Sequence, residues 1–71
     1  MAVNWSVIEA RWGDFKESAS QEWNNISAQR IADTLGRRED LASRVRDAYG
    51  LGEAEAQEQI SAWQARQPDP N

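Results

Sequence analysis

Four tryptophans in a chain of 71 residues are the feature that most constrains its fold. Trp5, Trp12 and Trp23 are separated by steps of seven and eleven residues. At about 100° per residue, each step returns a helical side chain to within roughly 20° of the previous one. The spacing therefore predicts that the three rings share one face of an amphipathic helical segment. A second stripe of this kind closes the chain and consists of Ala56, Ile60 and Trp63.

The chain is close to the lower size limit for a self-sufficient core, and it contains no cysteine that could form a disulfide. Large aromatic side chains compensate, since a buried tryptophan hides about 150–250 Å² of surface. We therefore expect the aromatic and aliphatic stripes to form the core, with Trp5 and Trp63 the rings that remain partly exposed. The predicted core residues are Trp5, Ile8, Trp12, Phe15, Trp23, Ile31, Leu35, Leu41, Val45, Tyr49, Ile60 and Trp63.

Capping residues and glycines divide the chain into predicted helices. Asn4 and Ser27 are typical residues before a helix, and Asn24 and Asn25 are typical of a left-handed helix end. Gly36 and Gly50 are further stop signals. Few β-branched residues occur and none alternates with polar ones, so no strand is expected. The resulting prediction is an all-α fold of four helices, over Trp5 to Gln21, residues 28 to 34, Arg37 to Ala48, and Glu53 to Arg66.

These helices are expected to form one compact bundle over residues 1–66. The first and last helices would meet through Trp12, Phe15, Ile60 and Trp63, and the middle two would close the other side. Pro68 and Pro70 cannot continue a helix, so residues 67–71 are expected to form a disordered C-terminal tail.

The chain has no histidine and no cysteine, so the usual general bases and thiol nucleophiles are missing. We expect no catalytic residue, no cofactor and no metal site. Glu55 and Glu58 lie one helical turn apart, and the simplest interpretation is two solvated carboxylates. No apolar run approaches membrane-spanning length, and the N-terminus lacks the pattern of a secretory signal, which favours a cytoplasmic protein without a membrane partner.

The middle of the chain is faintly basic although the net charge is −4. Arg37, Arg38, Arg44 and Arg46, with Arg30 upstream, are the candidate contacts for nucleic acid or a partner. Asp40 precedes Arg44 by four residues, a favourable spacing for an ion pair, and three further acids between residues 33 and 47 dilute the charge. Because nucleic-acid-binding domains usually carry an overall basic excess, nucleic-acid binding is the less favoured alternative.

Three segments together resemble the CsbD-like family of small bacterial stress proteins. They are Trp5-x-x-Ile8-Glu9-x-x-Trp12 with Lys16 and Trp23, the run Leu35-Gly36-Arg37-Arg38-Glu39-Asp40-Leu41, and Tyr49-Gly50 with Glu55-Ala56, Gln59-Ile60 and Trp63. The similarity covers about residues 4–63, which is nearly the whole chain.

The resemblance implies a compact helical domain, with two helical hairpins packed crosswise, and a role in the bacterial general stress response. The family has no established enzymatic activity or cofactor, so no catalytic residue can be carried over. An unidentified protein partner is compatible with this reading, as is a monomer or a weakly self-associating protein.

Overall fold

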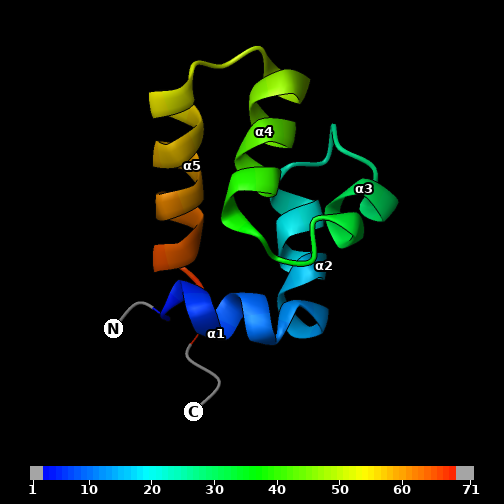
Figure 1. Cartoon of the computed structure of the whole chain (residues 1–71), viewed down its shortest axis with the longest axis vertical. Coiled ribbons are helices and arrows are strands. Elements are labelled where there is room, and N and C mark those ends of the chain that lie inside the picture. The colour runs from blue at the N-terminus through cyan, green and yellow to red at the C-terminus, as the bar shows by residue number, and fades with distance from the viewer. Residues whose placement is uncertain (1–2, 69–71) are drawn as a thin grey trace.

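The computed structural model describes residues 3–68, and within them the chain forms five helices and no strand. The all-α prediction is confirmed. The helices are α1 (Trp5–Ala10), α2 (Trp12–Glu22), α3 (Ala28–Asp33), α4 (Arg38–Tyr49) and α5 (Glu53–Ala65). Helices α4 and α5 run side by side in opposite directions, and α1 lies across one end of this pair (Figure 1).

The predicted count of four helices is wrong, because the segment expected to form one helix over residues 5–21 bends at Arg11. The backbone there has φ −116° and ψ 37°, which separates α1 from α2. A straight helix over this span would be about 26 Å long. The bend instead turns α1 toward the connection between α3 and α4, where the indole Nε1–H of Trp5 donates to the carbonyl of Gly36 at 2.9 Å.

The helix starts follow the sequence signals. The Asn4 side chain accepts a hydrogen bond from the backbone N–H of Ser6, and the Ser27 hydroxyl accepts one from that of Arg30. At the end of α4, Gly50 adopts the expected left-handed conformation with φ 65°. The prediction of a left-handed asparagine at the end of α2 is wrong, since the residue that caps the helix is Trp23 with φ −116°, and neither Asn24 nor Asn25 has a positive φ.

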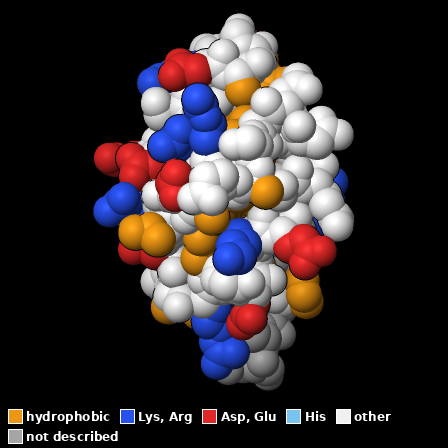
Figure 2. All heavy atoms as spheres, turned by 90° about the vertical axis from the view of Figure 1, so that its right-hand side faces the viewer, with side chains coloured by type: hydrophobic (Ala, Val, Ile, Leu, Met, Phe, Trp, Pro, Cys, Tyr) orange, Lys and Arg blue, Asp and Glu red, His pale blue; other side chains and the backbone are white. Residues whose placement is uncertain are grey.

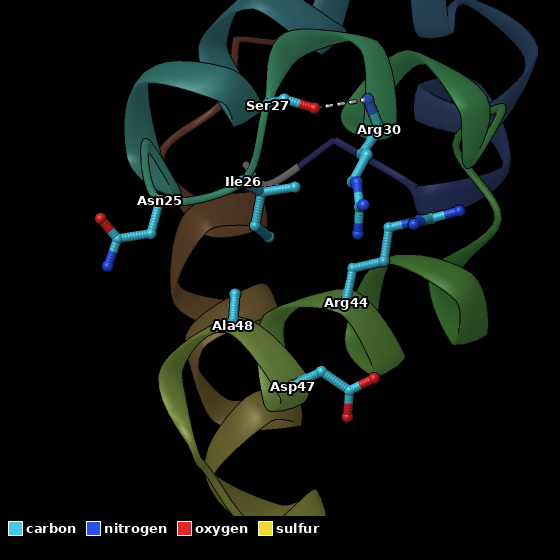
Figure 3. A pocket seen from close by; sticks show the side chains of 7 residues that line it. All are labelled: Asn25, Ile26, Ser27, Arg30, Arg44, Asp47 and Ala48. Carbon is cyan, nitrogen blue, oxygen red and sulfur yellow. Dashed lines mark hydrogen bonds between the residues drawn. The ribbon is translucent and has the colours of Figure 1, made fainter.

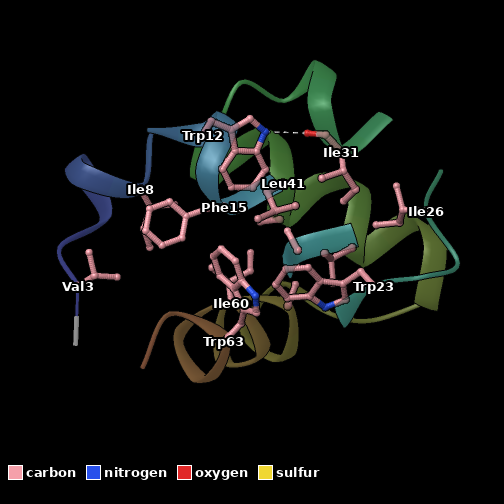
Figure 4. Close-up of a cluster of buried hydrophobic side chains, with 14 residues drawn as sticks. Val3, Ile8, Trp12, Phe15, Trp23, Ile26, Ile31, Leu41, Ile60 and Trp63 are labelled. Atoms are coloured by element: carbon pink, nitrogen blue, oxygen red, sulfur yellow. Dashed lines mark hydrogen bonds between the residues drawn. The ribbon is translucent and has the colours of Figure 1, made fainter. Parts of the chain in front are cut away.

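The core is organised around the Trp63 ring (Figure 4). Four aromatic rings surround it, with centroid distances of 5.8 Å to Trp5, 6.3 Å to Trp12, 6.5 Å to Phe15 and 5.6 Å to Trp23. Most of these pairs meet edge to face, the arrangement that aromatic quadrupoles favour. The buried core also includes Val3, Ile8, Ala19, Ile26, Ile31, Leu41, Ala42, Val45, Ala56 and Ile60, with Trp5 and Tyr49 partly buried at its edge.

Each indole N–H also has a partner within the protein. Trp12 donates to the carbonyl of Ile31 at 3.1 Å, Trp23 to the side-chain oxygen of Gln59 at 3.0 Å, and Trp63 to the hydroxyl of Ser18 at 3.2 Å. Among the described residues, no buried side-chain nitrogen or oxygen lacks a hydrogen bond. Trp63 is only 1% exposed, so the expectation that it would be partly exposed is wrong, whereas Trp5 is partly exposed as predicted.

The prediction of Leu35 as a core residue is wrong. Its side chain is 60% exposed, and its backbone has φ 55°, a left-handed conformation that costs a non-glycine residue roughly 1–2 kcal/mol. Helix α3 ends at Asp33, so the helical spacing that placed Leu35 inside does not continue. The neighbouring Thr34 is buried instead, and its hydroxyl donates to the carbonyl of Ile31 at 2.7 Å.

Gly36 permits the close approach of α1 to the α3–α4 connection. It has φ 76°, and a Cβ atom at this position would lie 2.9 Å from the Cα of Glu9 and 3.2 Å from the Trp12 ring. A glycine is therefore required here both for the backbone conformation and for the contact.

The described part of the predicted tail is held against the bundle. The Gln67 side chain accepts a hydrogen bond from Ser18 at 3.0 Å and donates one to the carbonyl of Trp63 at 2.9 Å. Residues 69–71 of the predicted tail lie outside the described range.

Candidate functional site

The four arginines singled out by the sequence all begin in or beside α4, but they do not share one open face. Arg38 points toward α5 and α1. Its guanidinium donates to the side chains of Gln57, Ser61 and Gln64 at 2.9, 2.8 and 3.1 Å, and lies 5.2 Å from the centroid of the Trp5 ring. These contacts join three helices, so the Arg38 charge is used within the molecule.

Arg37 and Arg46 form ion pairs at the surface. Arg37 binds Asp40 at 2.9 Å, and both side chains are more than half exposed. Arg46 binds Glu53, which connects the end of α4 to the start of α5. Exposed pairs of this kind contribute only about 0–1 kcal/mol to stability. The predicted pair between Asp40 and Arg44 is not among the ion pairs of residues 3–68, because Asp40 pairs with Arg37 one turn earlier.

Helices α3 and α4 together present a face of mixed charge, which we call the α3–α4 face. Basic and acidic side chains alternate along it in sequence, and Figure 2 shows them interspersed on the side of the molecule that carries α3. It contains as many acids as bases and has no net charge, unlike a typical phosphate-backbone interface. Its charged members are Arg30, Asp33, Arg37, Asp40, Arg44 and Asp47.

A hollow of about 410 Å³ opens at one end of this face, between the start of α3 and the last turns of α4 (Figure 3). Arg30 and Arg44 border it from the two helices, and neither takes part in an ion pair among residues 3–68. The loop at its rim is fixed by Tyr49, whose hydroxyl accepts a hydrogen bond from the backbone N–H of Asn25 at 3.1 Å. The remaining lining residues are Asn25, Ile26, Ser27, Asp47 and Ala48.

Sequence reasoning missed two features of this arrangement. Arg38 precedes the buried Leu41, Ala42 and Val45 by three, four and seven residues, so helical spacing alone places it on the inner face of α4. The sequence shows Arg30 only as a residue upstream of the arginine cluster, whereas the structure brings it to the same hollow as Arg44. No local sequence signal gives that juxtaposition, since it depends on how α3 packs beside α4.

The structure also locates the two acidic residues that the sequence places one helical turn apart in the last helix. Glu55 and Glu58 are both exposed on α5, and within residues 3–68 no group of three or more acidic, histidine or cysteine side chains is arranged to hold a metal ion. None of the described helices has the length and apolar composition needed to cross a bilayer.

Comparison with known proteins finds distant bacterial relatives. The chain is 23% identical to a UPF0337 protein of Nitrosomonas europaea, over 86% of this chain and 65% of that protein. It is also 23% identical to a UPF0337 protein of Pectobacterium atrosepticum, over 87% and 90% of the two chains. The UPF0337 protein YjbJ of Escherichia coli is 22% identical over 90% of this chain and 93% of its own length.

The chain thus spans slightly less than two thirds of the Nitrosomonas europaea relative and nearly all of the other two. No protein-family model matches the chain. No solved structure matches it either. The chain is therefore a distant relative of bacterial UPF0337 proteins.

Proposed function

We propose that this protein is a non-enzymatic stress-response protein of the CsbD-like type, acting by its abundance or through contact with another protein. The observation that carries the proposal is the similarity to UPF0337 proteins, which correspond to the CsbD-like family, along 86–90% of this chain. The three segments that resemble the family lie in α1, α2, the α3–α4 connection, α4 and α5, and among the described helices only α3 contains none of their residues. The proposal places the protein in the bacterial cytoplasm.

The distribution of side chains supports a role without chemistry of its own. The tryptophans, which are often the strongest anchors at binding surfaces, are packed around Trp63 with their N–H groups bonded internally. The sequence contains no histidine and no cysteine. What this chain offers to a partner is therefore a mainly polar and charged exterior, which includes the α3–α4 face.

The test is the amount of protein in the bacterium that encodes it. Quantitative mass spectrometry before and after osmotic, starvation and oxidative stress should show a rise under at least one condition, relative to a constitutive cytoplasmic protein. An unchanged level under all three would contradict the assignment. Crosslinking and affinity purification from stressed cells would then separate action by abundance, which recovers no specific protein, from action through a partner.

The alternative, a nucleic-acid-binding module, depends on Arg37, Arg38, Arg44 and Arg46 acting together. Arg38 and Arg46 have intramolecular partners and Arg37 is paired with Asp40, which lowers the charge available to a phosphate backbone. An electrophoretic mobility assay at low salt decides between the two. Salt-sensitive binding that is lost in the Arg37→Ala/Arg44→Ala double variant would favour the alternative, and unchanged mobility of DNA and RNA would exclude it.

A further inference from the structure

The hollow between α3 and α4 brings two guanidinium groups together without an ion-pair partner among residues 3–68. We propose that it binds a small organic phosphate, with the phosphate group between Arg30 and Arg44 and a ligand hydroxyl group at Asp47. Such a site is independent of the stress-response assignment and is not implied by the distant relatives.

The positions of the two arginines favour an oxyanion. In Figure 3, Arg30 extends from α3 toward α4, and Arg44 stands on the facing side of α4. Two like charges that border one hollow repel each other, and a bound anion removes that repulsion. The guanidinium group also presents a planar set of donors that matches the oxygens of a phosphate. Arg44 is partly buried, so its charge is screened less than that of a fully exposed arginine.

One neutral side chain adds a donor beside Arg30. The Ser27 hydroxyl accepts a hydrogen bond from the backbone N–H of Arg30, which leaves its own proton available to a ligand oxygen. The Asn25 amide extends away from the two arginines in Figure 3, and only its backbone is fixed, by the hydrogen bond to Tyr49. The phosphate end of the hollow can therefore supply both charged and neutral donors.

The other end of the hollow favours an organic phosphate that carries a hydroxyl group over inorganic phosphate. The Asp47 carboxylate lies apart from the two guanidinium groups in Figure 3, and an ionised carboxylate only accepts hydrogen bonds. Ile26 and Ala48 provide an apolar wall along the same hollow. A ligand with a phosphate at one end and a hydroxyl group at the other satisfies both ends, and the volume of about 410 Å³ is suited to a small molecule.

A nucleic-acid backbone fits this face less well. A strand that passed through the hollow would continue along the α3–α4 face, where it would meet Asp33 and Asp40. The whole chain also carries a net charge of −4, which opposes binding of a polyanion at long range. A single phosphate group confined to the Arg30 and Arg44 end avoids both penalties.

The test is a titration of the full-length, ¹⁵N-labelled protein with glycerol 3-phosphate, followed by backbone amide shifts. We expect saturable shifts confined to residues 25–30 and 44–48. Arg30→Gln and Arg44→Gln should each weaken binding by about tenfold or more, because each removes a charge-assisted contact. Arg37→Gln removes an equal charge from the same face outside the hollow and should leave binding unchanged. The dispersion of each variant spectrum verifies that it remains folded.

Asp47→Asn tests the hydroxyl contact separately. The wild type should prefer glycerol 3-phosphate to inorganic phosphate, and the variant should lose that preference while binding inorganic phosphate more tightly. The proposal is overturned if sodium chloride at matched ionic strength gives the same shifts, or if Arg37→Gln weakens binding as much as Arg30→Gln. It is also overturned if a short oligonucleotide binds these residues more tightly than the small phosphate, which would instead favour a nucleic-acid interface.

Discussion

The Trp63 core and the α3–α4 face use polar side chains in opposite ways. Around Trp63, each indole N–H has an internal acceptor and the aromatic rings meet edge to face. On the α3–α4 face, Arg37 and Asp40 form an ion pair, and Arg30 and Arg44 border an open hollow. The difference indicates that the stability of this small domain depends on the core, and that the charged face can change without loss of the fold.

The largest effect should follow from Trp63→Ala. This substitution removes the ring that four other aromatic rings contact, and large-to-small changes of buried aromatic residues cost about 3–5 kcal/mol. A domain of this size has only about 3–5 kcal/mol of stability, so the variant should be largely unfolded at 25 °C by far-UV circular dichroism. A cooperative melt close to that of the wild type would contradict the central position of Trp63.

The next largest effect is expected for Gly36→Ala, at about 2 kcal/mol or more. The added methyl group meets the backbone of Glu9 at 2.9 Å, and the left-handed backbone becomes strained. The matched control is Gly13→Ala, since Gly13 lies within α2 and an added Cβ has no atom within 4 Å. Because alanine is the better helix former by about 1 kcal/mol, urea denaturation should find the control neutral or more stable than the wild type. Equal effects of the two substitutions would contradict the docking of α1 on Gly36.

Arg38→Met should destabilise the protein by about 1–2 kcal/mol. It removes hydrogen bonds from the guanidinium to Gln57, Ser61 and Gln64 and its contact with the Trp5 ring, while it keeps the length of the aliphatic stem. Arg37→Met is the control, because it breaks only an exposed pair and should change the free energy of unfolding by less than about 0.5 kcal/mol. If the two variants unfold at the same urea concentration, the contacts of Arg38 stabilise the protein no more than an exposed ion pair does, which would contradict this account.

The smallest effect is expected for Leu35→Gly, which should stabilise the protein by about 0.5–1 kcal/mol. Glycine adopts φ 55° without steric cost, and the exposed leucine side chain contributes little packing. Thermal unfolding followed by circular dichroism measures the change. A loss of stability of about 2–5 kcal/mol, which is typical of a buried leucine, would indicate that Leu35 is buried and would contradict the structure.

Helical spacing predicted the buried stripes because burial repeats with the helical period within each helix. Trp12, Phe15 and Ala19 lie on the inner side of α2, and Leu41 and Val45 on that of α4, as that spacing requires. The spacing failed where the helix itself ended. Leu35 follows the end of α3 and points outward, and Thr34 fills the inner position.

The remaining differences are tertiary in origin. Neither sequence neighbour of Arg11 is a proline or a glycine, so no local signal marks the bend. Helix α1 separates from α2 there because Trp5 and Glu9 pack against the turn at Gly36. Similarly, nothing local to Arg30 or Arg44 indicates that they border one hollow. That arrangement follows from the packing of α3 beside α4.

The account depends on the tryptophans being part of the interior, and the exchange of their indole Nε1 protons tests it most directly. Four indole cross-peaks should appear in a ¹H–¹⁵N spectrum, and after transfer to deuterated water the signals of Trp12, Trp23 and Trp63 should persist far longer than that of free tryptophan. The Trp5 signal should exchange sooner, because its ring is only partly buried. Exchange of all four at the rate of free indole would show that the rings stand in solvent, and the core described above would be refuted.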